Sequence, residues 1–248
     1  AATRARLTTR DGLQPSMTAL PTVFVSHGAP TLVTDRGRTV DFLRQLATQL
    51  PRPRAILCIS AHWETDMPML TGSEKPQTIH DYSGFPEALY RLSYPAPGSP
   101  ELARRARELL KVQSQCAGID GTHGLDHGAW TPLLHMYPEA NVPVVQMSVQ
   151  PARGAAPHLA LGAMLAALRD EGILIIGSGH MTHNLREGFA AMRSGGHARP
   201  LAYAEEFSLW VGERISRRAL ADLTAYRQRA PHAARAHPTE EHFLPLFI

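Results

Sequence analysis

The sequence has few of the features that mark several common protein classes. Among its 248 residues there are only two cysteines, Cys58 and Cys116, and neither belongs to a CxxC pair. This excludes a disulfide framework and a cysteine-based structural zinc site, and two isolated thiols suit a reducing cytoplasm, where we expect the protein. No apolar run approaches the ~18 residues of a membrane span. No repeat with the period of a solenoid or propeller is present either.

Motifs for nucleotide binding and for serine hydrolysis are also missing. Neither GxGxxG nor a Walker A motif occurs, and Ser178 lies in Gly-Ser-Gly, one residue short of the GxSxG elbow. The net charge is only +3, and no aromatic residues are interleaved with the basic clusters. We therefore expect neither nucleic acid nor a membrane as a partner. The oligomeric state stays open.

Strands and helices are predicted to alternate from residue 21 onward. Continuous apolar runs predict strands, and helical periodicity predicts the long segments between them. The strands are expected at 22–26, 55–60, 142–149 and 173–176, and the main helices at 39–50, 100–111, 155–170, 200–217 and 219–227. This order indicates a single three-layer α/β/α domain with a largely parallel, mixed central sheet. Residues 1–20 are expected to be a disordered extension, with a transit peptide as the less favoured alternative.

Histidine is abundant, and its placement follows the predicted sheet. The chain has 13 histidines against 7 phenylalanines and 6 tyrosines. His27 and His62 follow the first two strands, and His180 and His183 follow the fourth. Ligands of parallel α/β sheets collect beyond the carboxyl ends of the strands, and histidine is the commonest metal ligand. A metal or catalytic centre at this edge is favoured over coincidence.

Two further segments contain candidate residues. Asp126 and His127 lie in a glycine-flanked loop before a short predicted helix, where Asp126 either orients an imidazole or, as the favoured role, bonds to the loop backbone. Near the C-terminus, Thr239 is expected to cap a helix that starts at Glu240. His242 would then lie in its first turn, where the helix dipole favours a neutral imidazole.

Seven motifs occur in order between about residue 21 and residue 246. They are Ser-His-Gly-Ala-Pro (26–30), Ser-Ala-His-Trp (60–63), Thr-Ile-His-Asp-Tyr-Ser-Gly-Phe-Pro (78–86), Tyr-Pro-Ala-Pro-Gly (94–98), Gly-Leu-Asp-His-Gly-Ala-Trp (124–130), Gly-Ser-Gly-x-x-x-His-Asn-Leu (177–185) and His-Pro-Thr-x-x-His (237–242). This ordered set resembles the class III extradiol aromatic-ring-cleaving dioxygenases, especially the DOPA 4,5-dioxygenase type. The resemblance implies a phosphorylase/hydrolase-like fold and makes residues 21–248 the catalytic domain.

The resemblance also implies roles for individual residues. His27, His62 and His242 would be metal ligands, His183 the catalytic base and a possible fourth ligand, and His127 a second active-site histidine. Similar sequences usually have asparagine in place of His180, so either His180 or His183 faces the metal. They also continue beyond the last motif. Four more side chains either line the ring-binding pocket or pack in the core: His80, Tyr82, Trp63 and Trp130.

The expected function is cleavage of a small catechol ring with dioxygen. The resemblance implies Fe(II) for activity, with zinc plausible in the purified protein and no organic cofactor. Three protein ligands leave positions open for the catechol and O2, and a histidine base suits removal of a phenolic proton. The product would be a muconic semialdehyde from DOPA or another dihydroxyphenyl compound. The alternatives are a zinc hydrolase on the same scaffold and a non-catalytic metal-binding protein.

Overall fold

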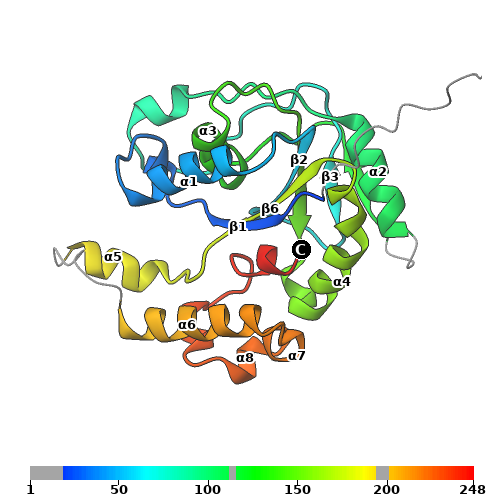
Figure 1. The fold of residues 1–248 in the computed structure, drawn as a ribbon. Helices are drawn as coiled ribbons and strands as arrows, with labels where there is room; N and C mark the ends of the chain where they lie inside the picture. Colours follow the sequence, from blue (N-terminus) through cyan, green and yellow to red (C-terminus); the bar gives the residue numbers. More distant parts are fainter. Residues whose placement is uncertain (1–18, 112–115, 194–200) are drawn as a thin grey trace, which may run out of the picture.

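The central feature of the fold is a mixed, mostly parallel sheet (Figure 1). The computed structural model describes residues 19–111, 116–193 and 201–248, so nearly all of the predicted N-terminal extension lies outside the described residues. The described residues form six strands in the order β1-β6-β2-β5-β3-β4, in which only the β3–β5 pair is antiparallel. The strands are β1 (Thr22–Ser26), β2 (Ala55–Glu64), β3 (Met69–Thr71), β4 (Gly118–Asp120), β5 (Val144–Val149) and β6 (Ile173–Gly179).

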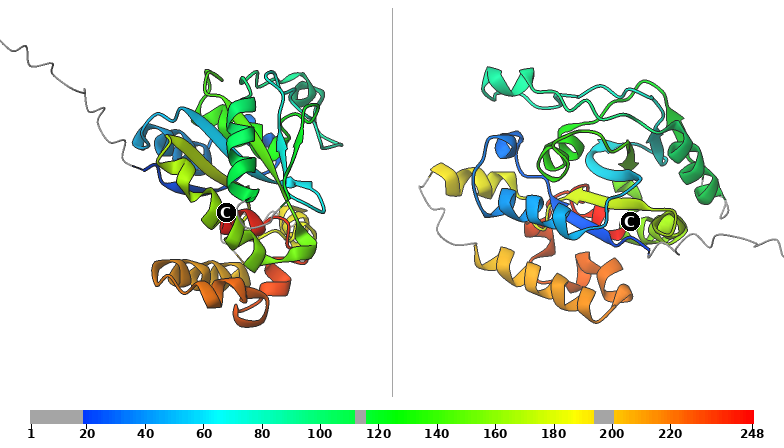
Figure 2. Two further views of the ribbon diagram at one scale, coloured as in Figure 1. Left: turned by 90° about the vertical axis from the view of Figure 1, so that its right-hand side faces the viewer. Right: turned by 45° about the horizontal axis from the view of Figure 1, so that its top comes forward.

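Helices cover both faces of the sheet, which gives the predicted three layers (Figures 1 and 2). Alternate residues of β2 face opposite sides, so Ile56 and Cys58 pack on one core cluster and Leu57 and Ile59 on the other. The first cluster lies under α1 and α3, and the second under α2, α4 and the C-terminal helices. The helices are α1 (Arg38–Gln49), α2 (Pro100–Lys111), α3 (His127–Met136), α4 (Ala155–Leu165), α5 (Leu185–Arg193), α6 (Ala202–Ser216), α7 (Leu220–Thr224), α8 (Tyr226–Arg229) and α9 (Ala233–Ala236).

Several element boundaries differ from those predicted. β2 continues past Ser60 to Glu64, so His62 lies inside the strand. The three-residue strands β3 and β4 were not predicted, because so short a segment shows no period. The helix predicted at 155–170 becomes 3₁₀ after Leu165, and α5 was not predicted.

The C-terminal helix predicted at Glu240 is absent. Residues 238–243 form bends and turns, and a 3₁₀ turn follows at Leu244–Phe247. The Thr239 hydroxyl donates to Glu241 Oε1 instead of capping a helix. The expectation that a helix dipole acts on His242 is therefore wrong.

None of the helices in the described ranges has the length and apolar composition needed to cross a membrane.

Candidate metal centre and active site

The site lies at the carboxyl edge of three adjacent parallel strands. β1, β6 and β2 are neighbours, and they bring together His27, His180 and His62. The pairing of β2 with β5 slips between Ile59 and Glu64, which shifts the strand at the position of His62. The adjacency of three parallel strands therefore produces the cluster, as the sequence predicted.

The C-terminal segment completes the cluster because β6 ends in glycines. A Cβ atom at Gly177 or Gly179 would overlap the backbone carbonyl of Pro245 or His242. The His180 N–H also donates to the His242 carbonyl oxygen at 2.8 Å. The Gly-Ser-Gly motif thus allows the last residues to lie directly against β6, and it brings His242 to the edge that holds His27 and His62.

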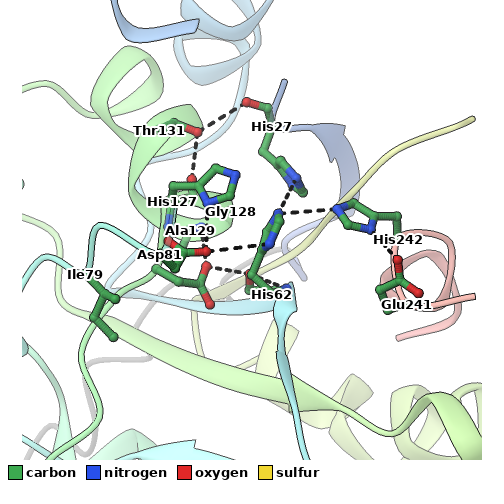
Figure 3. Close-up of polar contacts among 12 residues, drawn as sticks. His27, His62, Ile79, Asp81, His127, Gly128, Ala129, Thr131, Glu241 and His242 are labelled. Atoms are coloured by element: carbon green, nitrogen blue, oxygen red, sulfur yellow. Dashed lines mark hydrogen bonds and ion pairs between the residues drawn. The ribbon is translucent and has the colours of Figure 1, made fainter. Parts of the chain in front are cut away.

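Three histidines point one ring nitrogen toward a common centre (Figure 3). His62 Nε2 lies 3.0 Å from His27 Nε2 and 3.3 Å from His242 Nε2. At a ring-nitrogen-to-metal distance of about 2.1 Å, two ligands at 90° lie about 3.0 Å apart and two tetrahedral ligands about 3.4 Å apart. The spacing of the three nitrogens therefore fits a divalent metal ion.

The other ring nitrogen of each histidine has a polar partner. Ser178 gives its hydroxyl proton to the Gly128 carbonyl, so its oxygen accepts from His27 Nδ1–H at 3.0 Å. Glu241 Oε1 accepts from His242 Nδ1–H at 2.9 Å, and an Asp81 carboxylate oxygen lies 3.6 Å from His62 Nδ1. Ser178 and Glu241 thus hold the protons of His27 and His242 on Nδ1 and leave the Nε2 lone pairs of these two rings available for a metal.

Burial keeps the imidazoles of His27 and His62 neutral. Burial, with a smaller effect from neighbouring histidines, holds the pKa of His27 well below its usual value and lowers that of His62 to about 3. Burial alone would raise the pKa of Glu241, but hydrogen bonds, first among them the one from His242, lower it to about 2. Neutral imidazoles beside ionised carboxylates form a donor set suited to a cation.

His127 lies beside the three histidines at the start of α3, which begins earlier than predicted. Its ring centroid is 3.9 Å from that of His62. Its Nδ1 bonds to Asp81 Oδ2 at 2.8 Å, and its backbone N–H donates to Asp81 Oδ1 at 2.8 Å. The hydrogen bonds outweigh the effect of burial, which by itself would raise the pKa of Asp81, and the net pKa is lowered. Asp81 was not singled out by sequence reasoning, although it lies inside the 78–86 motif.

Asp126 is a buried cap rather than a partner of an imidazole. Its carboxylate accepts from the Ala129 N–H at the start of α3 and from the Ser60 hydroxyl at 2.6 Å. Gln146 donates an amide N–H to the other carboxylate oxygen. Asp126 thus fixes the start of α3 to β2 and β5, in line with the favoured backbone role.

His180 and His183 both lie against the cluster. The His183 ring stacks on His242 at 3.4 Å, and its Nδ1 is 3.8 Å from Glu241 Oε1. The His180 ring is perpendicular to that of His27 at 4.5 Å. Burial, followed by the neighbouring His242, lowers the pKa of both, that of His183 to about 4. Neither belongs to the group of converging Nε2 atoms, and which of them faces a metal stays open.

The four candidate pocket residues occupy different positions. The Tyr82 ring packs perpendicular to His127 at 5.6 Å, and its hydroxyl donates to the Leu89 carbonyl. His80 bonds to the Leu92 carbonyl and lines a groove of about 510 Å³ between residues 74–80 and 92–97. Trp130 is fully buried and packs against the rings of His80 and Tyr82. Trp63 stacks on His123 at 3.9 Å. Their roles toward a substrate stay predictions.

Comparison with known proteins identifies the family. The model for the catalytic LigB subunit of aromatic ring-opening dioxygenase matches residues 17–248. A 4,5-DOPA dioxygenase extradiol of Beta vulgaris is 42% identical over 231 residues, which are 92% of this chain and 84% of that protein. One of the same name from Escherichia coli K12 is 40% identical, over 93% of this chain and 84% of its own length.

A solved structure agrees with the fold. The crystal structure of an uncharacterised protein from Escherichia coli K12 superimposes with a TM-score of 0.76 and 36% identity, covering 92% of this chain and 86% of the other. Since the family model spans all the described residues and the two relatives are 42% and 40% identical, the chain belongs to the LigB family of aromatic ring-opening dioxygenases.

Proposed function

We propose that this dioxygenase is iron-dependent and opens the ring of a small catechol, with a DOPA-like compound as the first candidate. The convergence of the Nε2 atoms of His27, His62 and His242 at metal-ligand spacing is the observation that carries this proposal. The names of the relatives support an extradiol position of cleavage. Bound Fe(II) would bring catechol and O2 together and pass electron density between them, which overcomes the slow direct reaction of triplet oxygen.

The remaining residues handle protons. His183, neutral at pH 7, is proposed to accept a phenolic proton of the catechol. His127 is proposed to donate a proton as the ring opens. The Asp81 carboxylate oxygen, 2.8 Å from His127 Nδ1, orients the ring for this role. Both atoms of O2 end in the product, a muconic semialdehyde with one new aldehyde and one new carboxylate.

Anaerobic reconstitution with Fe(II), followed by oxygen uptake with DOPA, caffeate and protocatechuate, tests this function. We expect one O2 consumed per catechol and a yellow product, and no uptake by the zinc-loaded protein. If the iron-loaded protein binds its metal tightly but consumes no O2 with any catechol, the proposal fails. A zinc hydrolase or a metal-binding protein would then be favoured.

The free thiols Cys58 and Cys116 support the further proposal of a cytoplasmic location.

A further inference from the structure

The Asp81 carboxylate accepts two hydrogen bonds from His127, one from its backbone N–H and one from its ring. Asp81 Oδ1 accepts the backbone N–H of His127, and Oδ2 bonds to the ring Nδ1, each at 2.8 Å. The backbone N–H belongs to the first residue of α3 and has no partner within the helix, so it can only donate outward. This fixes which carboxylate oxygen meets the backbone and which meets the ring.

The carboxylate therefore determines the tautomer of His127. An ionised carboxylate oxygen only accepts, so the ring proton stays on Nδ1 and Nε2 keeps its lone pair. We propose that Asp81 is a positioning residue: its two hydrogen bonds orient the His127 ring, keep Nδ1 toward the carboxylate and leave Nε2 as the ring atom that is free to act during ring cleavage. This inference rests on the proposed function.

The loop that carries Asp81 is fixed to α3 and to the segment just before it. The Ile79 N–H donates to the Leu125 carbonyl at 2.7 Å, and Trp130 Nε1–H donates to the Ile79 carbonyl at 3.0 Å. The ring of Tyr82, the next residue of this loop, packs perpendicular to the His127 ring. These contacts hold the carboxylate in place before any substrate binds, as a positioning role requires.

Asp81→Asn tests the proposal with little change in shape. The backbone N–H of His127 still needs an acceptor, so the amide oxygen takes the place of Oδ1 and the amide NH2 faces the ring. The NH2 group donates to Nδ1, which moves the ring proton to Nε2. The same replacement next to a catalytic histidine is known to impose the wrong tautomer in serine proteases.

We expect kcat for oxygen uptake by the iron-loaded Asp81→Asn protein to fall about 100- to 10,000-fold, the usual contribution of general acid–base catalysis. Metal content, melting temperature and the KM for the catechol should change little, because the three Nε2 atoms keep their places. ¹⁵N NMR of the imidazole nitrogens in the zinc-loaded proteins should show Nδ1–H for His127 in the wild type and Nε2–H in the variant. The exposed Asp66, on the loop after β2, provides the control, and Asp66→Asn should match the wild type.

A double-mutant cycle separates action through His127 from other effects. If Asp81 acts through His127, Asp81→Asn adds no further loss of kcat in the His127→Ala background. Additive losses, an unchanged kcat, or loss of metal from Asp81→Asn would overturn the proposal.

The wild-type spectrum alone decides the tautomer of His127, whether or not the variant folds and whether or not the protein cleaves a catechol. An Nε2–H signal without an Nδ1–H signal for His127 in the zinc-loaded wild type overturns the inference even if Asp81→Asn does not fold. Absence of oxygen uptake by the wild type instead refutes the proposed function, and the NMR result still decides the tautomer.

Discussion

At the scale of single residues, the metal centre depends on which ring nitrogen each histidine leaves free. His27 and His242 reach this state by different means, since a serine hydroxyl holds the Nδ1 proton of one and a glutamate that of the other. Ser178 is able to do so because the Gly128 carbonyl takes its own proton. A chain of three groups thus fixes the tautomer of one proposed ligand.

Ser178→Ala removes the acceptor for His27 Nδ1–H and frees the ring to rotate or change tautomer. We expect zinc or Fe(II) to bind about 10- to 100-fold more weakly, the usual effect of losing a partner of a metal ligand. Competition titration with a chromophoric chelator measures this. Ser208→Ala on α6, whose hydroxyl bonds only to the helix carbonyl of Ala204, should leave affinity unchanged. Equal affinities of the Ser178→Ala protein and the wild type would contradict the proposed network.

The histidines should separate into two groups on substitution. His27→Ala and His62→Ala each remove a converging nitrogen, so metal and activity should be lost together. His127→Ala should retain the metal and lose about 100-fold or more in turnover, because it removes only a proton donor. Metal analysis beside oxygen uptake distinguishes the groups. His232→Gln, on the surface beside Glu206, is the control and should behave as the wild type.

At the scale of elements, the start of α3 connects the sheet to the site. Asp126 caps the helix and accepts from side chains of β2 and β5, while Asp81 accepts the N–H of the next residue, His127. Both carboxylates lie at the positive end of the helix dipole, which stabilises their charge. The orientation of His127 therefore depends on the position of the whole helix.

Asp126 should give the stability a distinct pH dependence. Burial raises its pKa to about 6, against about 3.9 in an unfolded chain. Between these values the native state binds the proton more tightly, so this contribution is present below about pH 4 and lost as pH rises through about 6. The free energy of unfolding of the metal-free wild type, relative to that of Asp126→Asn, should fall by up to about 3 kcal/mol over this range. Urea unfolding at pH 4.5, 5.5 and 6.5 measures it, and parallel pH profiles would count against the assignment.

At the scale of the whole molecule, the C-terminal segment contributes residues to the site and also holds a neighbouring loop in place. It carries Glu241 and His242, and it also forms hydrogen bonds with the loop after β6. His237 Nε2–H donates to the Met181 carbonyl, and the His183 N–H donates to the Ala236 carbonyl at 2.8 Å. Metal binding at His27, His62 and His242 would therefore join the first strand, the middle of the sheet and the end of the chain.

Metal should accordingly stabilise the whole fold, and the metal-free protein should depend on pH. Zinc at 100 times its dissociation constant should add about 2.7 kcal/mol to the free energy of unfolding at pH 7. His62 and His183, with pKa values of about 3 and 4, bind protons more weakly folded than unfolded, so the metal-free protein should lose stability as pH falls from 7 to 5. The gain from zinc itself should be similar at pH 7 and pH 5, because His27 and His62 are already neutral in the metal-free fold and protons compete little for these two ligands there.

Thermal unfolding with and without zinc at pH 7 and pH 5 measures these effects. His242→Ala should show no gain from zinc at either pH. A full gain in that variant would place the metal elsewhere.

The sequence alone determined the layered α/β fold and much of the candidate site. Apolar runs and helical periods mark the buried strands and the long helices, and the histidines after β1 and β6 follow from the geometry of parallel strands. His127 and His242 were singled out from the glycine-flanked loop and the C-terminal segment, and the motif resemblance supplied their expected roles. These features are local, or recur in a fixed order along the chain, so they can be read without coordinates.

Only the tertiary structure decided which atoms meet. The inclusion of His62 in β2, the start of α3 at His127 and the absence of a helix at Glu240 depend on sheet pairing and on the packing of the last residues against β6. The partners Ser178, Asp81 and Glu241 belong to three different segments. Hydrogen bonds act over about 3 Å and need exact orientation, and no local sequence pattern encodes a distance between segments that are remote along the chain.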